Sequence, residues 1–166
     1  MNPRNIRELI HFLYGKYVRG LDGADLEAFV RFPHQWKRLT REDEELLGTK
    51  VSCVYCGRTE GVRPWPVIPP QRAGGDQRLL RILRGKDNLV PTCEECVSAM
   101  GERDVLEWHP RLEDIPREAM FAFLKLAYQI HLTQGTLDSP DPNMDGRLDL
   151  HDLAVALLYF ALRREP

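Results

Sequence analysis

All four cysteines of this 166-residue chain fall in two C-x-x-C pairs, and this spacing constrains the fold more than any other feature. The first pair is Cys53 and Cys56, and the second is Cys93 and Cys96. A C-x-x-C turn places two thiolates on one side of a tight loop, so two such turns supply the four ligands of a tetrahedral zinc site. We therefore expect one structural zinc ion, because four protein ligands leave no open position for catalysis.

The residues around the cysteines refine this expectation. Gly57 follows the first pair directly, where a metal-binding turn favours a positive φ. The second pair is predicted to open a helix that continues through Val97 and Ala99, because a helix N-terminus favours thiolates. The 36 residues between the pairs (57–92) are too many for a minimal zinc ribbon, so we expect a hairpin and a loop there. Two alternatives, a redox dithiol and ordinary buried cysteines, are disfavoured by the paired spacing and the lack of a βαβ pattern.

Composition and charge place the chain in an ordinary class. Hydrophobic residues make up 43% and charged residues 29%, and the net charge of −2 excludes a polycation that coats nucleic acid by charge alone. No apolar run approaches 18 residues, so no membrane span is predicted. The N-terminal stretch is amphipathic and lacks the features of a signal peptide. These features predict a cytoplasmic protein, in which metal binding is favoured over disulfides.

The pattern along the chain predicts an α+β fold that is mainly helical. We distinguish a helical N-terminal region (1–48), a four-cysteine module (49–110), a connecting helix (111–136), and a C-terminal loop and helix (137–166). The second of these is called the cysteine module below. It is rich in proline and glycine, whereas the regions around it are dominated by helical periodicity.

Apolar residues at helical spacing predict the helices outside the cysteine module. A first helix is indicated by Ile6, Leu9, Ile10, Leu13, Tyr14 and Tyr17. A second is expected to begin at Asp22 or Gly23. A third is expected to follow Thr40, which resembles a capping box with Asp43. The segment 116–132 is predicted to form a helix with a proline at its start.

The cysteine module carries an ordered series of short motifs. It reads C-V-Y-C-G, V-I-P-P, G-G-D, D-N-L-V-P and C-E-E-C. The series resembles the zinc-binding members of the HNH endonuclease family. The residues that carry the resemblance are Val67, Ile68, Pro69, Gly74, Gly75, Asp76, Asn88, Leu89, Val90, Pro91, Cys93 and Cys96. The resemblance implies a zinc-bound ββα-metal finger, similar to a treble clef and flanked here by helices. It also implies an ancestry in metal-dependent phosphodiester cleavage.

The catalytic residues of that family have no counterparts in the expected strand. Where the family has Asp-His, which bind the cation and act as general base, this chain has Trp65-Pro66. Neither residue binds a cation or accepts a proton. Asn88 is the only motif residue retained, and the resemblance implies that it orients the loop. No histidine lies between His34 and His109, and a lone His109 is more simply a surface or capping residue. We therefore predict a nuclease scaffold without its nuclease site.

A basic stretch lies between the two cysteine pairs. Its members, within 15 residues of each other, are Arg72, Arg78, Arg81, Arg84 and Lys86. With the leucines and isoleucine between them, they predict a short basic amphipathic helix that contacts nucleic-acid phosphates. The alternative is a solvated charged face without a partner.

Residues 141–152 fit the template of an EF-hand calcium loop. The predicted ligands at positions 1, 3, 5, 7, 9 and 12 are Asp141, Asn143, Asp145, Arg147 through its backbone carbonyl, Asp149 and Asp152. Asp replaces the usual Glu at position 12, which lowers calcium affinity or admits magnesium, and the stretch also resembles dockerin loops. The alternative is an Asp-rich turn that caps a helix. The helix predicted over 150–164 is apolar almost all round and is expected to be buried or to meet a protein partner.

Three functions remain open from the sequence. The first is a non-catalytic, zinc-stabilised HNH-like module with a calcium loop that binds nucleic acid or serves as an accessory protein. The second is an active HNH-type endonuclease with a displaced catalytic site. The third is a protein-interaction or assembly subunit that uses its C-terminal helix.

Overall fold

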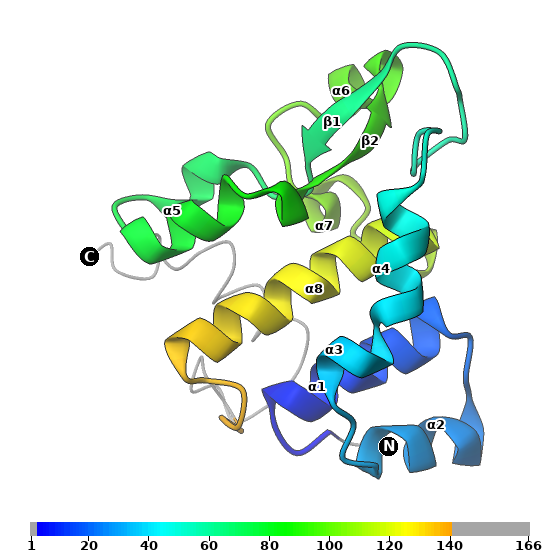
Figure 1. The fold of residues 1–166 in the computed structure, drawn as a ribbon, viewed down its shortest axis with the longest axis vertical. Helices are drawn as coiled ribbons and strands as arrows, with labels where there is room; N and C mark the ends of the chain where they lie inside the picture. The colour runs from blue at the N-terminus through cyan, green and yellow to red at the C-terminus, as the bar shows by residue number, and fades with distance from the viewer. Residues whose placement is uncertain (1–2, 141–166) are drawn as a thin grey trace.

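The computed structural model describes residues 3–140 of the chain. This part is mainly helical and contains one antiparallel sheet of two strands, in agreement with the predicted fold class. In chain order the elements are α1 (Ile6–Leu13), α2 (Gly23–Arg31), α3 (Trp36–Leu39), α4 (Arg41–Gly48), β1 (Val62–Pro66), α5 (Gln77–Leu83), β2 (Leu89–Cys93), α6 (Glu94–Met100), α7 (Val105–Trp108) and α8 (Arg117–Gln134). Helix α8 crosses the middle of the molecule, with α1 to α3 on one side and the sheet on the other (Figure 1).

Helix α8 forms the centre of the hydrophobic core and confirms the helix predicted over 116–132. Its residues are apolar around most of the circumference, and a helix of that kind is covered on all sides. Its buried side chains are Ala119, Met120, Phe121, Ala122, Phe123, Leu124, Leu126, Ala127, Ile130 and His131. It packs against α1, α4 and α5. Pro116 precedes its first residue, and Gly135 ends it in a left-handed conformation with φ of 74°.

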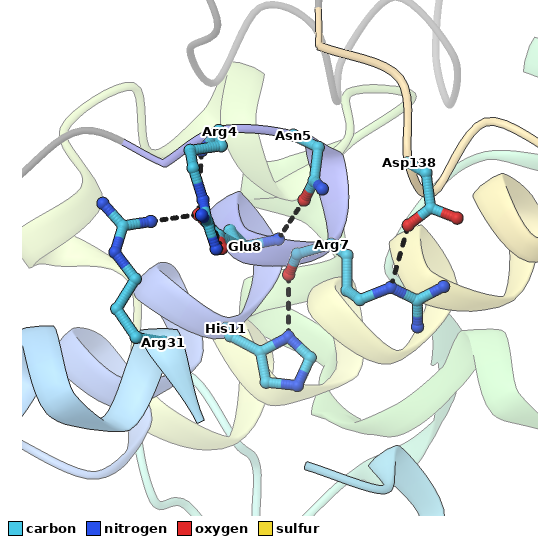
Figure 2. A network of polar contacts seen from close by, with 7 residues as sticks. All are labelled: Arg4, Asn5, Arg7, Glu8, His11, Arg31 and Asp138. Carbon is cyan, nitrogen blue, oxygen red and sulfur yellow. Dashed lines mark hydrogen bonds and ion pairs between the residues drawn. The ribbon is translucent and has the colours of Figure 1, made fainter. Parts of the chain in front are cut away.

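A polar network holds the first helix (Figure 2). The side chain of Asn5 caps α1 by accepting a hydrogen bond of 2.9 Å from the backbone N–H of Glu8. Glu8 also pairs with the guanidinium group of Arg31, which joins α1 to α2 (Figure 2). Arg7 donates to the carboxylate of Asp138 at 3.2 Å, so the last described residues lie beside α1 (Figure 2).

The predicted capping box at Thr40 and Asp43 is wrong, although α4 does begin directly after Thr40. The hydroxyl of Thr40 donates to the backbone carbonyl of Trp36 at 2.9 Å, one turn earlier, which is the local bond that competes with capping. The buried carboxylate of Asp43 accepts from the hydroxyl of Tyr14 and from Arg117 at 2.6 Å. Asp43 therefore joins α4 to the end of α1 and to α8.

The two strands of the sheet are linked by a long connection that contains α5. Trp65 lies opposite Val90 in the antiparallel register. The buried side chain of Asn88 closes the base of the connection. It accepts from the backbone N–H of Ile68 at 2.9 Å and donates to the carbonyls of Ile68 and Leu83, each at 2.7 Å. The expected hairpin is present, and its loop is a structured helical insert.

The core is continuous between the two sides of the molecule. Buried apolar residues of α1, of the sheet region and of α8 belong to one cluster, which includes Ile10, Val90 and Phe121. None of the helices within residues 3–140 combines the length and the apolar character that crossing a membrane requires.

Candidate metal centre

The structure brings the four cysteines together, as the spacing predicts. Cys53 and Cys56 lie on a turn before β1, Cys93 ends β2, and Cys96 lies in the first turn of α6. Their Sγ atoms all lie within 4.8 Å of one another, and Cys56 and Cys93 approach to 3.5 Å. A tetrahedron with Zn–S bonds of about 2.3 Å has sulfur atoms about 3.8 Å apart, so the cluster has the size of a zinc site. No disulfide joins these four residues.

Backbone hydrogen bonds shape the first metal-binding turn. The N–H of Gly57 donates to the carbonyl of Cys53 at 2.9 Å, and Gly57 has the predicted positive φ, at 80°. A side chain there would strain the turn. The N–H of Val54 donates to the carbonyl of Pro91 at 2.9 Å, which fixes the turn against β2. The two cysteine pairs are therefore held together by main-chain contacts as well as by any ion.

The second pair lies at the start of a helix, which confirms that prediction. Cys93 occupies the position before the first residue of α6, and Cys96 follows one turn later. This spacing places both sulfur atoms at the helix N-terminus, where the partial positive charge of the backbone favours thiolates. Val97 and Met100 each lie one helical turn beyond a cysteine, on the same face of the helix, and are buried in the core. The helix is thus anchored by the core on one face and by the cysteines at its end.

The environment of the sulfur atoms suits a cation. Burial opposes ionisation of Cys53, but the backbone N–H groups of Cys93, Cys56 and Tyr55 donate toward it, and the pKa of its thiol falls to about 7. The pKa of the Cys96 thiol is raised by burial and by the neighbouring sulfur atoms. Four thiolates this close repel one another, and a divalent cation removes that repulsion. The four-cysteine cluster is therefore a candidate metal centre with a donor set that fits zinc.

The remainder of the cysteine module offers no second set of metal ligands. Within residues 3–140, the four cysteines are the only group of three or more His, Cys, Asp or Glu side chains close enough to hold one ion. Trp65 and Pro66 lie on β1, opposite Val90 and Leu89 of β2. His109 stacks on Trp108 with ring centroids 4.4 Å apart, and burial lowers the pKa of its imidazole. No described carboxylate joins His109 in a metal-binding group.

Four of the five predicted basic residues lie together on an exposed surface. Arg78 and Arg81 lie on α5, Arg84 follows its last residue, and Lys86 lies in the next turn. All four are exposed. No ion pair within residues 3–140 engages them, so their charges face solvent. Helix α5 lies at an edge of the molecule, away from α1 to α4 (Figure 1).

Arg72 differs from the other four basic residues. Its guanidinium group donates to the buried carboxylate of Asp104 at 3.2 Å and also pairs with Glu107. Asp104 and Glu107 form a capping box at the start of α7. Burial, with the adjacent Glu107, raises the pKa of Asp104 to about 7. The structure therefore places Arg72 in a polar cluster that joins the insert to α7, apart from the exposed cations.

Sequence reasoning missed two contacts of the cysteine module. The capping box of Asp104 and Glu107 has the readable D-x-x-E spacing, which is a recognised helix-start signal. Arg63 lies over the ring of Trp65 at 5.2 Å. These two residues are two apart on β1, so the alternation of a strand places them on one face. The predicted calcium ligands, from Asp141 to Asp152, lie outside the described residues.

Comparisons with protein-family models, with curated proteins and with solved structures found no match to this chain.

Proposed function

We propose that this chain is a non-catalytic, zinc-stabilised module of HNH-like, treble-clef type that binds nucleic acid. The observation that carries the proposal is the four-cysteine cluster formed by a turn, the end of β2 and the start of α6. This order of turn, two strands and helix is the order that the HNH resemblance implies. Asn88, the retained motif residue, holds the connection between the strands through three backbone contacts, which supports the same comparison.

The absence of catalysis follows from the residues on β1. A metal-dependent hydrolase needs a carboxylate or imidazole on the cation and a base beside the water. Trp65 and Pro66 supply neither, and the ring of His109 is stacked on Trp108. In this proposal, the cysteine module keeps the HNH-like scaffold without its catalytic residues and uses that scaffold to bind nucleic acid.

The exposed cations of α5 supply the binding surface. Arg78, Arg81, Arg84 and Lys86 have no acidic partner within the described residues, and free guanidinium groups on one surface suit phosphate. Each phosphate contact adds about 0.9 to the slope of log affinity against log salt on duplex DNA. Binding of a nucleic acid through this surface therefore depends steeply on ionic strength.

Fluorescence anisotropy with a labelled 20-base-pair DNA duplex, titrated at several salt concentrations, tests the proposal. The triple variant Arg78→Ala, Arg81→Ala and Arg84→Ala is expected to weaken binding and to lower the salt slope by about 2 to 3. Arg38→Ala, which removes an exposed arginine of α3, is the matched control and is expected to leave the slope unchanged. Absence of binding by the wild type, or equal slopes in all three proteins, contradicts the proposal. An RNA or single-stranded probe extends the same series.

Incubation with supercoiled plasmid in Mg²⁺ or Mn²⁺ separates binding from cleavage. We expect no nicking. Nicking that disappears in His109→Ala supports the alternative of an active nuclease with a displaced catalytic site. A flat salt dependence without nicking favours an assembly subunit that uses the C-terminal helix.

We further propose that residues 141–152 bind one Ca²⁺, or Mg²⁺ more weakly, through the EF-hand pattern of the sequence. Calorimetric titration of the full chain with each cation tests this proposal. Asp141→Ala and Asp145→Ala are expected to abolish the heat of calcium binding, whereas Asp138→Asn, just outside the loop, is expected to retain it. Equal heats for all variants contradict the site.

A further inference from the structure

A groove of about 630 Å³ lies between α3, α4 and α8. The rings of Trp36 and Tyr128 stack in its lining, 4.7 Å apart and within 8° of parallel. Leu132 also lines the groove and has 57% of its surface exposed. This volume is in the range of binding sites, and an aromatic stack beside an exposed leucine is a surface that a second apolar segment can cover.

The two ends of the groove differ in charge. At the end near the aromatic stack, Lys37 follows Trp36 in the lining. At the other end, the ammonium group of Lys125 lies 3.0 Å from Glu44 and 3.5 Å from Asp87, so that two carboxylates face one lysine. The two remaining charged residues of the lining, Arg41 and Glu45, carry opposite charges. An occupant that is acidic at one end and basic at the other therefore fits the groove in one direction.

The described part of the chain ends beside this groove. Arg7 donates to Asp138 at 3.2 Å and to the hydroxyl of Tyr128 at 3.3 Å, so one guanidinium group links the chain end to the groove lining. Figure 2 shows the first of these contacts. Tyr128 stacks on Trp36, the residue before Lys37, so the chain leaves the described structure on the side of the aromatic stack.

We propose that residues 150–164 of this same chain occupy the groove. The stretch 153–162 reads L-A-V-A-L-L-Y-F-A-L, the longest apolar run of the sequence. Asp149 and Asp152 precede it, and Arg163 and Arg164 follow it. Entry from the Lys37 end places the basic end, Arg163 and Arg164, beside Glu44 and Asp87.

The lengths agree with this arrangement. Ten residues in helical form extend about 15 Å, and the groove wall from Lys125 to Leu132 on α8 extends about 10 Å. The link 141–149 needs only to turn back from the chain end. The proposal does not depend on zinc or on nucleic acid, and it assigns the apolar C-terminal segment to its own chain and not to another protein.

Indole signals in ¹H–¹⁵N spectra of the full chain test the proposal, because the chain has three tryptophans and only Trp36 lines the groove. Leu158→Asp is expected to shift the Trp36 signal and to leave those of Trp65 and Trp108 in place. His151→Asn, a polar change at the start of the segment, is the control and is expected to leave all three signals in place. A Trp36 signal that is the same in wild type and Leu158→Asp overturns the proposal. A shift that depends on protein concentration also overturns it, because it indicates a second copy as the occupant.

A reciprocal change in the groove gives a second, independent reading. Leu132→Asp is expected to speed chymotryptic cleavage after Tyr159 and Phe160 by about tenfold or more, since cleavage follows release of the segment. Leu46→Asp alters a leucine of similar exposure on α4, outside the groove, and is expected to leave the rate at that of the wild type. Equal rates in all three proteins contradict the proposal.

Discussion

The cysteine module and the helical region around α8 are stabilised in different ways. In the cysteine module, two short strands and α6 meet at four sulfur atoms, and α6 has only seven residues. Around α8, large apolar side chains from α1 and α8 pack in a continuous core. A short helix and a two-stranded sheet bury too little apolar surface to be stable alone, whereas an 18-residue buried helix does not need a metal. We therefore expect the cysteine module to depend on a bound metal more than the region around α8 does, although both contribute to one core.

Of the changes considered, substitution of a cysteine ligand is expected to perturb the structure most, and to perturb the cysteine module more than α8. Cys93→Ser deletes a buried ligand at the junction of β2 and α6, and structural zinc contributes roughly 10 kcal/mol or more to folding in small zinc modules. We expect the fluorescence of Trp65 and Trp108 to change strongly, while helical circular dichroism from α8 persists in part. Ser98→Ala, on the exposed side of α6, is the control. A fully native spectrum in Cys93→Ser removes the distinction between the two regions.

A cavity in the helical core should have the next largest effect. Phe121 is 2% exposed and packs in the core from the second turn of α8. Phe121→Ala is expected to lower the free energy of unfolding by about 3 to 5 kcal/mol, because truncation of a buried aromatic leaves a cavity. Urea titration of the zinc-loaded protein measures the change. A loss below about 1 kcal/mol shows that α8 is not the centre of the core.

Substitution of Asn88 tests the polar contacts that close the helical insert between β1 and β2. Asn88→Ala leaves one N–H and two carbonyl groups without partners in a buried place. Each lost bond costs about 1 kcal/mol, so the expected destabilisation is about 3 kcal/mol. Urea titration again gives the value, and faster amide exchange in α5 and β2 shows where the effect lies. Unchanged exchange there would falsify the role assigned to this side chain.

The smallest effect concerns pH and a single histidine of α8. Burial lowers the pKa of His131 to about 4, below the 6.5 of an unfolded histidine. The unfolded chain therefore takes up the proton first as the pH falls, and stability is lost between about pH 6.5 and 4. Relative to the wild type, His131→Gln is expected to gain about 2 kcal/mol of stability between pH 7 and pH 5. Parallel stability curves of the two proteins over this pH range contradict the expectation.

The sequence predicts the parts of the structure that depend on local spacing. Each C-x-x-C pair forms a tight turn because that spacing allows few conformations, and Gly57 has its positive φ for the same reason. Helix α8 follows from its apolar periodicity, and α5 from the alternation of arginine and leucine. In each case the interaction that decides the structure lies within a few residues of the pattern.

The sequence fails where a distant partner decides the outcome. Thr40 and Asp43 have the spacing of a capping box. The carboxylate of Asp43 instead accepts hydrogen bonds from Tyr14 and Arg117, which are remote in sequence. Arg72 belongs to the predicted basic stretch, yet Asp104 lies close enough to pair with it in the fold. Neither pairing has a local signal, because each depends on how helices pack.

The stack of Trp36 on Tyr128 has the same origin. It forms because α3 and α8 lie side by side, and these residues are far apart along the chain. The groove that the stack lines therefore could not be found from the sequence alone.

The metal content of the reduced, folded protein decides whether the four cysteines form a zinc site. Native mass spectrometry with elemental analysis should find one zinc ion per chain bound by the four cysteines, and none in a variant with serine at Cys53 and Cys93. A zinc-free wild type that remains fully folded, with four thiols that react freely with a thiol reagent, would contradict the account.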